Sequence, residues 1–433
     1  MFSFADPLQT RTSVPARRHR LRWASATAVF GLTFALAACS ASGTGPAPAI
    51  SAAPGQTTDC GTAPVIAPQE DPDNLVATMP QDVQDAFSGF SQPVKASAWA
   101  EALPAKEGPY KVGLIFLPVS DVWGTVAVAE IKDQFEKAKA AGIVEGELMI
   151  QIPADAATMT AADQIAGYQK LVQEGADVIL MFPLDAEAMK APVDAAGEQG
   201  IPTITIVGNV PSAYAVNVGN NAFNYVAQPM AQAAELMGKK GNIIIVGGTE
   251  GFSITTVALN AAQQVLQSCP DIKVVGTLYG GYSPSVTKSQ LVTFLASHPE
   301  QIDAVLSVST QGAGVWDAFQ SVGRPYPIVV DVGTTAASLA HWDKATADGY
   351  AGVGVAETAK QVMGSIWDVL LRTMAGEKPI LNQIPAVPTI VTNDNLDEYV
   401  VPGESTSSQQ ETKSVGPWID PEFVDEFFSE PAQ

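Results

Sequence analysis

Short apolar runs alternate with helical stretches along most of this chain, and this alternation limits its fold more than any other feature. The first apolar runs are residues 111–117, 147–153, 177–183 and 202–207, and amphipathic helices are predicted over 125–141, 158–174 and 186–199. Strands that are apolar on both faces, each followed by a helix, are typical of a parallel sheet covered by helices. The sequence therefore predicts an α/β lobe.

The same pattern repeats further along the chain, which indicates a second lobe of the same design. Its apolar runs are residues 241–248, 272–279, 304–309 and 327–333, and helices are predicted over 253–268, 286–297 and 312–322. One more strand and helix, at 350–356 and 357–374, are surplus to this lobe and can cross back to the first. The predicted fold class is α/β, with two doubly wound parallel-sheet lobes.

The N-terminus has the layout of an export signal. Arginines between Arg11 and Arg22 precede a stretch, 23–38, that is too short and too rich in small residues to span a membrane comfortably. Residues 36–39, Leu-Ala-Ala-Cys, resemble the lipobox of bacterial lipoproteins. We expect removal of residues 1–38 and a lipid on Cys39; the alternative is an ordinary secretory signal that happens to contain a cysteine.

A tether and two further cysteines follow the signal. Residues 39–68 are rich in Gly, Pro, Ala, Ser and Thr, which bury little surface, so a flexible tether is predicted. Cys60 and Cys269 belong to an exported chain, and disulfides persist outside the cytoplasm. They form either a bridge between tether and body or two unrelated thiols, because spacing alone does not show proximity.

Charge and length exclude several classes of protein. The formal net charge is −22, from 45 acidic and 23 basic side chains, and such a surface repels nucleic-acid backbones. The negative charge also argues against attachment to anionic lipid through basic patches. The acyl chains of the lipid expected on Cys39 are then the membrane anchor. A chain of 433 residues is too long for one core and suggests two lobes with extensions.

Residues from about 111 to 392 resemble type I periplasmic solute-binding proteins, the ribose- and galactose-binding kind that feeds ABC transporters. Four segments carry the resemblance: KVGLIFLPVSDVWGT, LVQEGADVILMFPLDAEAM, AAGEQGIPTITI and HPEQIDAVLSVSTQGAGVWDAFQSVG. The resemblance implies two lobes joined by hinge strands near 215–219, 352–356 and 384–389, with the ligand between the lobes. It also implies an ABC permease as partner.

This resemblance and the composition together define the expected domains. We expect a signal peptide at 1–38, a lipidated tether at 39–68, an N-terminal extension at 69–108, lobe one at 109–216 and 356–384, lobe two at 217–355 and 385–392, and a C-terminal extension at 393–433. The aromatic-rich segment 416–428 of the last extension contains enough apolar surface to dock on the body.

Residues that follow the predicted strands are the candidates for a binding site, because ligands of open parallel sheets lie beyond the carboxyl ends of the strands. The candidate ligand-binding residues are Asp121, Trp123, Phe182, Asp185, Asn209, Phe252, Thr256, Tyr282, Ser309, Gln311 and Asp331. Trp123 offers a flat face that suits a sugar ring or an aromatic ring. We expect Tyr282, Phe252 and Trp316 to face it.

The candidate site departs from the sugar-binding pattern of the family. Val207 and Gly208 fill places where these proteins usually carry an Asp-Arg pair. Thr256 stands near a common arginine position, Ser309 replaces a common asparagine, and Asp331 is displaced from the usual acidic position. The only arginines after the signal are Arg324 and Arg372, both on or after predicted helices. We therefore expect an aromatic, weakly polar pocket without a cationic clamp.

Several candidates have a purely structural alternative. Trp123, Phe252 and Trp316 can belong to the core, since aromatic residues after strands often do. Asp121 and Asp185 can cap the helices that follow them. Gly247 and Gly248 hint at a phosphate cradle, but the spacing of known phosphate-binding loops is absent, which favours a tight turn.

The predicted function is that of a lipid-anchored, extracytoplasmic solute-binding protein on the outer face of the cell membrane. It would capture a sugar-like or weakly polar cyclic solute and deliver it to the permease as a monomer, without cofactor, metal or nucleic acid. No catalytic or metal-binding motif accompanies His298 or His341, so an enzyme is not expected. The alternative is a ligand-sensing receptor that presents its closed form to a membrane signalling partner.

Overall fold

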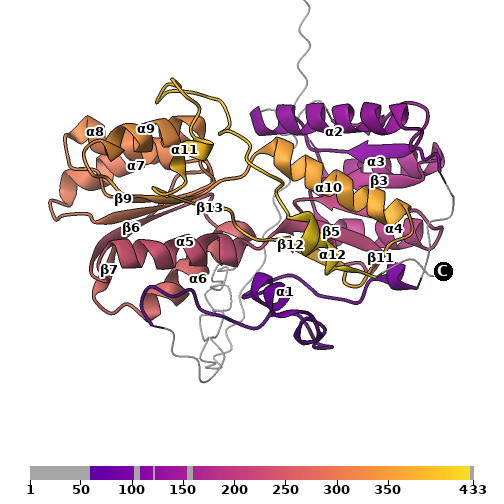
Figure 1. The fold of residues 1–433 in the computed structure, drawn as a ribbon, viewed down its shortest axis with the longest axis horizontal. Helices are drawn as coiled ribbons and strands as arrows, with labels where there is room; N and C mark the ends of the chain where they lie inside the picture. The colour runs from indigo at the N-terminus through magenta and orange to yellow at the C-terminus, as the bar shows by residue number, and fades with distance from the viewer. Residues whose placement is uncertain (1–58, 102–107, 120–121, 154–158, 430–433) are drawn as a thin grey trace, which may run out of the picture. The chain divides into compact units, whose positions relative to one another are not determined.

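The computed structural model describes residues 59–101, 108–119, 122–153 and 159–429. The expected signal peptide, Cys39, most of the tether and Asp121 lie outside these residues. Two sheets with helices on both faces form the body of the chain (Figure 1). The predicted fold class, two α/β lobes built on parallel sheets, is confirmed.

The first sheet has the strand order β12-β5-β4-β3-β1-β2, and all neighbouring strands run parallel. Its strands are β1 (Val112–Ile115), β2 (Met149–Gln151), β3 (Val178–Met181), β4 (Thr203–Ile206), β5 (Ala215–Asn220) and β12 (Gln383–Ala386). Its helices are α2 (Val122–Ala140) and α10 (Ala359–Met374) on one face, and α3 (Ala161–Gln173) and α4 (Ala186–Gly197) on the other.

The second sheet has the order β13-β10-β9-β8-β6-β7, parallel except for β13, which runs antiparallel to β10. Its strands are β6 (Gly241–Gly247), β7 (Ile272–Tyr279), β8 (Ala304–Val308), β9 (Ile328–Val332), β10 (Val353–Val355) and β13 (Ile390–Thr392). Helices α5 (Ala222–Leu236) and α6 (Ser253–Gln267) cover one face, and α7 (Pro284–Ser297), α8 (Gly312–Val322) and α9 (Ala336–Thr346) cover the other.

The apolar runs form strands because both of their faces are covered. In β6, Ile243 and Ile245 pack with α5 and α6, whereas Ile244 and Val246 pack with α7 and α8. Successive side chains of a strand point to opposite faces, so a strand between two helical layers is apolar at every position. This arrangement explains why the strands read as continuous apolar runs.

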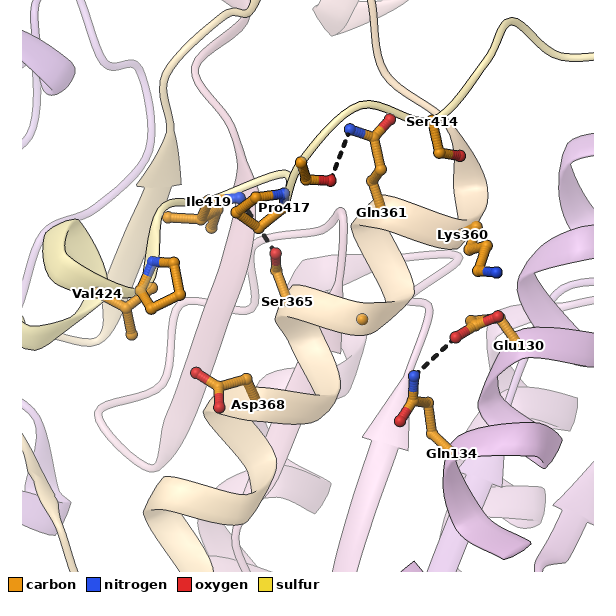
Figure 2. A pocket seen from close by; sticks show the side chains of 13 residues that line it. Glu130, Gln134, Lys360, Gln361, Ser365, Asp368, Ser414, Pro417, Ile419 and Val424 are labelled. Atoms are coloured by element: carbon orange, nitrogen blue, oxygen red, sulfur yellow. Dashed lines mark hydrogen bonds between the residues drawn. The ribbon is translucent and has the colours of Figure 1, made fainter. Parts of the chain in front are cut away.

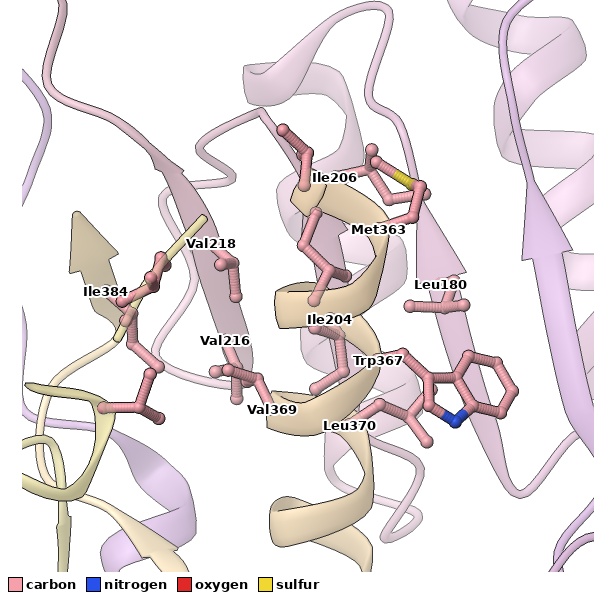
Figure 3. Close-up of a cluster of buried hydrophobic side chains, with 14 of the residues drawn as sticks. Leu180, Ile204, Ile206, Val216, Val218, Met363, Trp367, Val369, Leu370 and Ile384 are labelled. Carbon is pink, nitrogen blue, oxygen red and sulfur yellow. The ribbon is translucent and has the colours of Figure 1, made fainter. Parts of the chain in front are cut away.

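Helix α10 follows the second lobe in the chain but packs on the first sheet. Its Trp367 and Leu370 belong to one buried cluster with Ile204 of β4, Val216 of β5 and Ile384 of β12 (Figure 3). The residues around α10 are therefore part of the first lobe, although nearly the whole second lobe separates them from it in the sequence.

The chain passes between the two sheets three times. It leaves the first sheet after β5, returns between β10 and α10, and leaves again between β12 and β13. The first two crossings directly follow the hinge segments 215–219 and 352–356 that the family resemblance implied, and the third lies within the implied segment 384–389. β5 pairs with its neighbours as far as Asn220, so the first sheet extends beyond the expected lobe boundary at residue 216.

Both extensions pack on the body. The N-terminal extension contains η1 (Val76–Thr78), α1 (Gln81–Ala86) and η2 (Ala98–Ala100), and the C-terminal one contains α11 (Leu396–Tyr399), α12 (Pro421–Asp425) and β14 (Phe428–Ser429), which pairs with β11 (Lys378–Pro379). Phe87 and Trp99 of the first, and Trp418 and Phe427 of the second, are buried in the core of the first lobe. The extensions are therefore part of the folded molecule.

Cys60 and Cys269 are joined by a disulfide, with their Cα atoms 4.8 Å apart. Cys269 follows α6 and is buried, and Ile66 packs into the same core of the second lobe, so residues 59–68 are not the flexible end of a tether that the composition predicted. The end of the expected tether is thereby tied to the second lobe, while the N-terminal extension that follows packs on the first.

Candidate ligand-binding site

Each sheet has one point at which successive strands turn to opposite sides. In the first sheet β1 lies between β2 and β3, and in the second sheet β6 lies between β7 and β8. Ligands of open α/β sheets bind beyond the carboxyl ends of the strands at such a switch point. The residues after β1 and β3, and those after β6, β7 and β8, therefore define the candidate site.

An aromatic cluster lies at the switch point of the first sheet. Phe116 follows β1, Phe182 follows β3, and Trp123 lies in the first turn of α2. The ring centroids of Phe116 and Phe182 are 5.3 Å apart, those of Trp123 and Phe182 are 6.0 Å apart, and Trp123 stacks on Phe116 at 6.5 Å. Phe116 is buried, while Trp123 and Phe182 are partly exposed. The cluster thus offers the two partly exposed rings of Trp123 and Phe182, which both pack against the buried ring of Phe116.

Asn209 lies after β4, at the same end of the first sheet. The turn that carries it is fixed by Asn217 of β5, whose side-chain amide exchanges hydrogen bonds with the backbone of Val210 at 2.8 and 3.0 Å. The hydroxyl of Thr205 donates to the Gly208 carbonyl at 2.5 Å. These contacts hold Asn209 in place with its side chain partly exposed.

Tyr282 lies at the switch point of the second sheet, packed on Gly248. A Cβ atom on Gly248 would lie 2.1 Å from the Tyr282 ring, so any larger residue there would displace this ring. The Tyr282 hydroxyl shares a 2.8 Å hydrogen bond with Thr255, the neighbour of the candidate Thr256. Gly247 and Gly248 therefore serve a close turn under an aromatic side chain.

Gln311 is fully buried and uses its whole hydrogen-bonding capacity within the second lobe. Its Oε1 accepts from the Tyr282 amide nitrogen (3.1 Å) and the Thr287 hydroxyl (3.0 Å). Its Nε2 donates to the carbonyl oxygens of Val308 (2.5 Å) and Gly247 (3.4 Å). A side-chain amide has two lone pairs and two hydrogens to offer. Gln311 therefore holds the Tyr282 loop and has no free group for a solute.

Phe252, Thr256 and Ser309 also lie at this end of the second sheet. Phe252 precedes α6 and is 56 % exposed, and the Thr256 hydroxyl donates to the Phe252 carbonyl at 3.1 Å within the first turn of α6. Ser309 directly follows β8 and is partly exposed. All three side chains are accessible at the carboxyl edge of the sheet.

Three non-glycine residues at the carboxyl edges of the sheets have strained backbone conformations. Val207, Tyr282 and Ser309 have φ angles of 51°, 59° and 63°, in the left-handed region that non-glycine residues rarely adopt. Val207 directly follows β4 and Ser309 directly follows β8, while Tyr282 lies in the β7–α7 loop. Such conformations cost of order 1–3 kcal/mol each and cluster at ligand sites, where the surrounding structure over-determines them.

Asp331 is buried beneath α8 and does not reach the exposed edge. Its strand neighbours Val330 and Val332 pack with α5 and α6, whereas the Asp331 carboxylate points to the opposite face, against Gly312. A Cβ atom on Gly312 would lie 2.3 Å from the carboxylate. Burial raises the pKa of Asp331 to about 7, because the ionised form loses its hydration.

The Asp331 carboxylate has no hydrogen-bond partner among the residues that the structure describes, and the same holds for the hydroxyls of Ser307 and Thr334. Ser338 lies close enough to oppose this rise of the Asp331 pKa, but its hydroxyl donates to the Thr335 carbonyl. Asp331 is therefore a covered group in the second lobe, and its position does not support direct contact with a solute.

Two other candidates have structural roles. Asp185 caps α4, since its carboxylate accepts from the Ala188 amide at 3.0 Å. Trp316 is 2 % exposed and packs between Tyr326, His341 and Tyr350, so the expectation that it faces Trp123 is wrong. Its position in α8 places it in the helical layer of the second lobe, behind the sheet.

Both body arginines are engaged elsewhere. Arg324, in the loop after α8, donates to the backbone carbonyls of His298 and Glu300. Arg372 of α10 pairs with Asp368 at 2.9 Å and with Asp425 of the C-terminal extension. Neither guanidinium is available to clamp an anion at the strand ends.

A pocket of about 380 Å³ lies elsewhere, between α2, α10 and the C-terminal extension (Figure 2). Its polar lining includes Glu130, Lys360 and Asp368, and its apolar wall includes Ile419 and Val424. None of the candidate residues lines it. It is therefore separate from the strand ends that carry the candidate site.

A family model described as "Periplasmic binding protein domain" matches residues 112–373, which is more than half of the chain. The chain belongs to this family. The match covers both sheets except β12 and β13, and it ends just before the end of α10. The extensions on either side lie outside it, so they are additions of this periplasmic binding protein to the matched domain.

One curated relative and two solved structures are similar to this periplasmic binding protein. The xylitol-binding protein of Mycolicibacterium smegmatis is 28% identical over 183 residues, which are 42% of this chain and 52% of the relative. This chain thus matches about half of the relative's length.

The two solved structures are ABC transporter solute-binding proteins. The one from Thermobispora bispora has a TM-score of 0.58 at 20% identity and covers 75% of this chain and 98% of its own. The one from Bacillus halodurans, with bound myo-inositol, has a TM-score of 0.54 at 21% identity and covers 68% of this chain and 98% of its own. At these identities the two structures support the fold.

The described part of the chain lacks two kinds of feature. It contains no helix long and apolar enough to cross a membrane. Within the same residues, no group of three or more His, Cys, Asp and Glu side chains is arranged to hold a metal ion.

Proposed function

We propose that this periplasmic binding protein captures a small, uncharged polyol or sugar-like solute between its two lobes and delivers it to an ABC permease. The observation that carries this proposal is the cluster of Phe116, Trp123 and Phe182 at the switch point of the first sheet. Partly exposed aromatic faces suit the apolar C–H face of a ring or a folded polyol.

The polar groups at the strand ends favour an uncharged solute. Asn209, Thr256 and Ser309 offer amide and hydroxyl groups, whereas both body arginines are engaged elsewhere. Neutral groups of this kind bind hydroxyls, but they do not compensate the desolvation of a buried ionic ligand. The xylitol bound by the curated relative and the myo-inositol in the Bacillus halodurans structure are both uncharged polyols.

The proposed location is extracytoplasmic, with the protein anchored to the outer face of the cell membrane as a monomer. The support is the basic and apolar N-terminus followed by Leu-Ala-Ala-Cys, together with the Cys60–Cys269 disulfide, which suits an oxidising compartment. A sensing receptor on the same scaffold is the alternative. Genes for a permease and an ATPase beside the gene of this protein would favour transport.

A thermal-shift screen tests the proposed solute class. Xylitol, myo-inositol and neutral monosaccharides form one arm, and the matching sugar acids and amino sugars form the other. A bound solute at 100 times its dissociation constant adds about 2.7 kcal/mol to the free energy of unfolding. We expect stabilisation in the neutral arm and recovery of the solute unchanged by mass spectrometry. Stabilisation by the charged arm alone, or conversion of the solute, would contradict the proposal.

The lipid anchor is tested by Cys39→Ala in cells. Without the thiol no diacylglycerol can be attached, so the protein should move from the membrane fraction to the soluble or culture fraction. Solute affinity should stay unchanged, because the anchor plays no part in the binding site. Full membrane retention of the variant would show that Cys39 is not the anchor.

A further inference from the structure

The end of the C-terminal extension crosses the hinge and contacts both lobes. We call residues 410–427 the strap. In the second lobe, the Gln410 carbonyl accepts from the amide nitrogen of Ala336 at the start of α9 (3.3 Å). The amide nitrogen of Lys413 donates to the carbonyl of Tyr399 at the end of α11 (3.1 Å). The first part of the strap is thus fixed to the second lobe.

The later part of the strap is fixed to the first lobe along α10. The Gln361 side-chain amide donates to the carbonyls of Val415 (2.8 Å) and Gly416 (3.1 Å), and the Ser365 hydroxyl accepts from the Ile419 amide nitrogen (3.1 Å) (Figure 2). These bonds occupy successive turns of one helix face. The strap therefore lies along α10 after it has left the second lobe.

Trp418 connects the strap to the hinge itself. Its indole is 4 % exposed and packs in the core of the first lobe. The indole nitrogen donates to the hydroxyl of Tyr225 (2.9 Å) and to the carboxylate of Glu357 (3.1 Å). Tyr225 is a buried residue of α5 in the second lobe, and Glu357 lies in the crossing between β10 and α10. One side chain thus joins the first lobe, the second lobe and a hinge segment.

Trp418, Tyr225 and Glu357 form a triad whose hydrogen bonds lie in a buried environment. Burial and the nearby Glu411 raise the pKa of Glu357, while hydrogen bonds from Tyr225 and Trp418 oppose the rise. The pKa of Tyr225 is held well above its ordinary value by burial and by the Glu357 charge, so the tyrosine stays a hydrogen-bond donor. Hydrogen bonds between such buried groups are stronger than in water, because water is excluded from them.

The first hinge crossing is braced in a similar way by the N-terminal extension. Asn221, directly after β5, donates from its side-chain amide to the carbonyls of Ala86 and Ser88, both at 2.8 Å. The neighbouring Asn224 donates to the Asp85 carbonyl at 2.9 Å. Two hinge crossings are therefore held by the N-terminal extension and the strap. Both segments lie outside the matched family domain, which covers residues 112–373.

We propose that Trp418, Tyr225 and Glu357 are positioning residues that restrict the relative rotation of the lobes in the unliganded protein. With the strap in place, the unliganded protein samples fewer relative orientations of the two lobes. Fewer orientations are then lost when the lobes close on a solute. Binding to a restricted hinge costs less conformational entropy, so the triad raises solute affinity without touching the solute. The affinity part of this inference rests on the proposed solute-binding function, whereas the restriction of the hinge does not.

The test measures the distance between the lobes without any ligand. Spin labels on Lys132→Cys in α2 and Lys273→Cys in β7, both exposed positions, report the interlobe distance distribution in a Cys39→Ser background. Trp418→Phe keeps an aromatic ring in the core but removes the shared donor. We expect it to broaden the distribution. Tyr225→Phe, which deletes a single hydroxyl, should broaden it in the same direction if Trp418→Phe fails to fold.

Trp367→Phe is the matched control, because Trp367 is buried in the same core of the first lobe, on α10, but is not a member of the triad. It should leave the distribution as narrow as in the parent protein. Unchanged distributions in both Trp418→Phe and Tyr225→Phe, or equal broadening in the Trp367→Phe control, would overturn the proposal.

Titration with xylitol then separates this inference from the proposed function. Where xylitol binds the parent protein, Trp418→Phe should bind it about three- to tenfold more weakly, while Trp367→Phe should bind it equally well. Equal affinity in Trp418→Phe despite a broadened distribution would overturn the affinity part. If xylitol does not bind the parent protein, the proposed solute is wrong, but the distance measurement still decides whether the hinge is restricted.

Discussion

At the scale of single residues, the candidate site divides into side chains that present a surface and side chains that support them. Trp123 and Phe182 present partly exposed rings, and the buried Phe116 fixes their position. Gln311 fixes Tyr282 by hydrogen bonds. The sequence indicated the presenting residues because they follow strands. It did not indicate the supporting roles, since these depend on which loops meet in space.

The Trp123 ring is the most direct target for mutation. Trp123→Ala removes the largest aromatic face at the first switch point and should weaken solute binding by about 2 to 4 kcal/mol, the range of a buried hot-spot aromatic. Trp123→Phe should retain most of the affinity, because a smaller ring still offers a flat apolar face. Isothermal titration of both variants checks this. Parent-like affinity in Trp123→Ala would exclude Trp123 from the site.

Asp331 predicts a pH dependence of stability. Its pKa is about 7 in the folded protein and about 3.9 in an unfolded chain, so folding takes up a proton between these values. The free energy of unfolding should therefore decrease as pH rises from about 4 to about 7, and the penalty should persist above that range.

Asp331→Asn removes this penalty. At pH 8 we expect the variant to be more stable than the parent protein by about 4 kcal/mol, and the difference should become small near pH 4, where both side chains are neutral in the folded protein. Urea denaturation at the two pH values measures it. A stability difference that does not change with pH would mean that Asp331 does not titrate in this way.

At the scale of helices and strands, the sequence predicted most of the fold, because strands covered on both faces must be apolar throughout. The helix predicted over 312–322 matches α8 (Gly312–Val322), and that over 186–199 ends two residues beyond α4 (Ala186–Gly197). The helix predicted from 125 begins earlier, at Val122, which places Trp123 inside its first turn.

Asp331 shows what the pattern could not predict. Every position of a strand buried on both faces is covered, so apolar neighbours do not reveal which face a polar residue takes. In the structure α5 and α6 cover Val330 and Val332, and this packing places the Asp331 side chain on the opposite face. The position of Trp316 was not predictable for a similar reason, since an aromatic residue in a helix can face either the sheet or the strand ends.

The disulfide connects two elements that are far apart in the sequence. Cys60 and Cys269 are separated by 209 residues, and a bridge over so long a loop restricts the unfolded chain. Replacing both cysteines by serine should lower the free energy of unfolding by about 2 to 4 kcal/mol. Chemical denaturation measures this loss. Two titratable thiols from Cys60 and Cys269 in the denatured, unreduced parent protein would contradict the bridge.

At the scale of the whole molecule, three crossings join two lobes whose strand ends carry separate halves of the candidate site. Phe182 and Asn209 belong to the first lobe, and Tyr282 and Ser309 to the second. A solute that contacts both halves is bound most tightly when the lobes approach each other around it, by rotation about the hinge segments. The two extensions add contacts at this hinge that the matched family domain does not include.

The central claim is that a solute binds between the lobes and draws them together. Small-angle X-ray scattering of the protein, with and without the solute that gives the largest thermal shift, tests this claim most directly. We predict a smaller radius of gyration at saturating solute, and no such change when Trp123→Ala is measured at the same solute concentration. An unchanged scattering curve of the parent protein at proven saturation would contradict binding between the lobes.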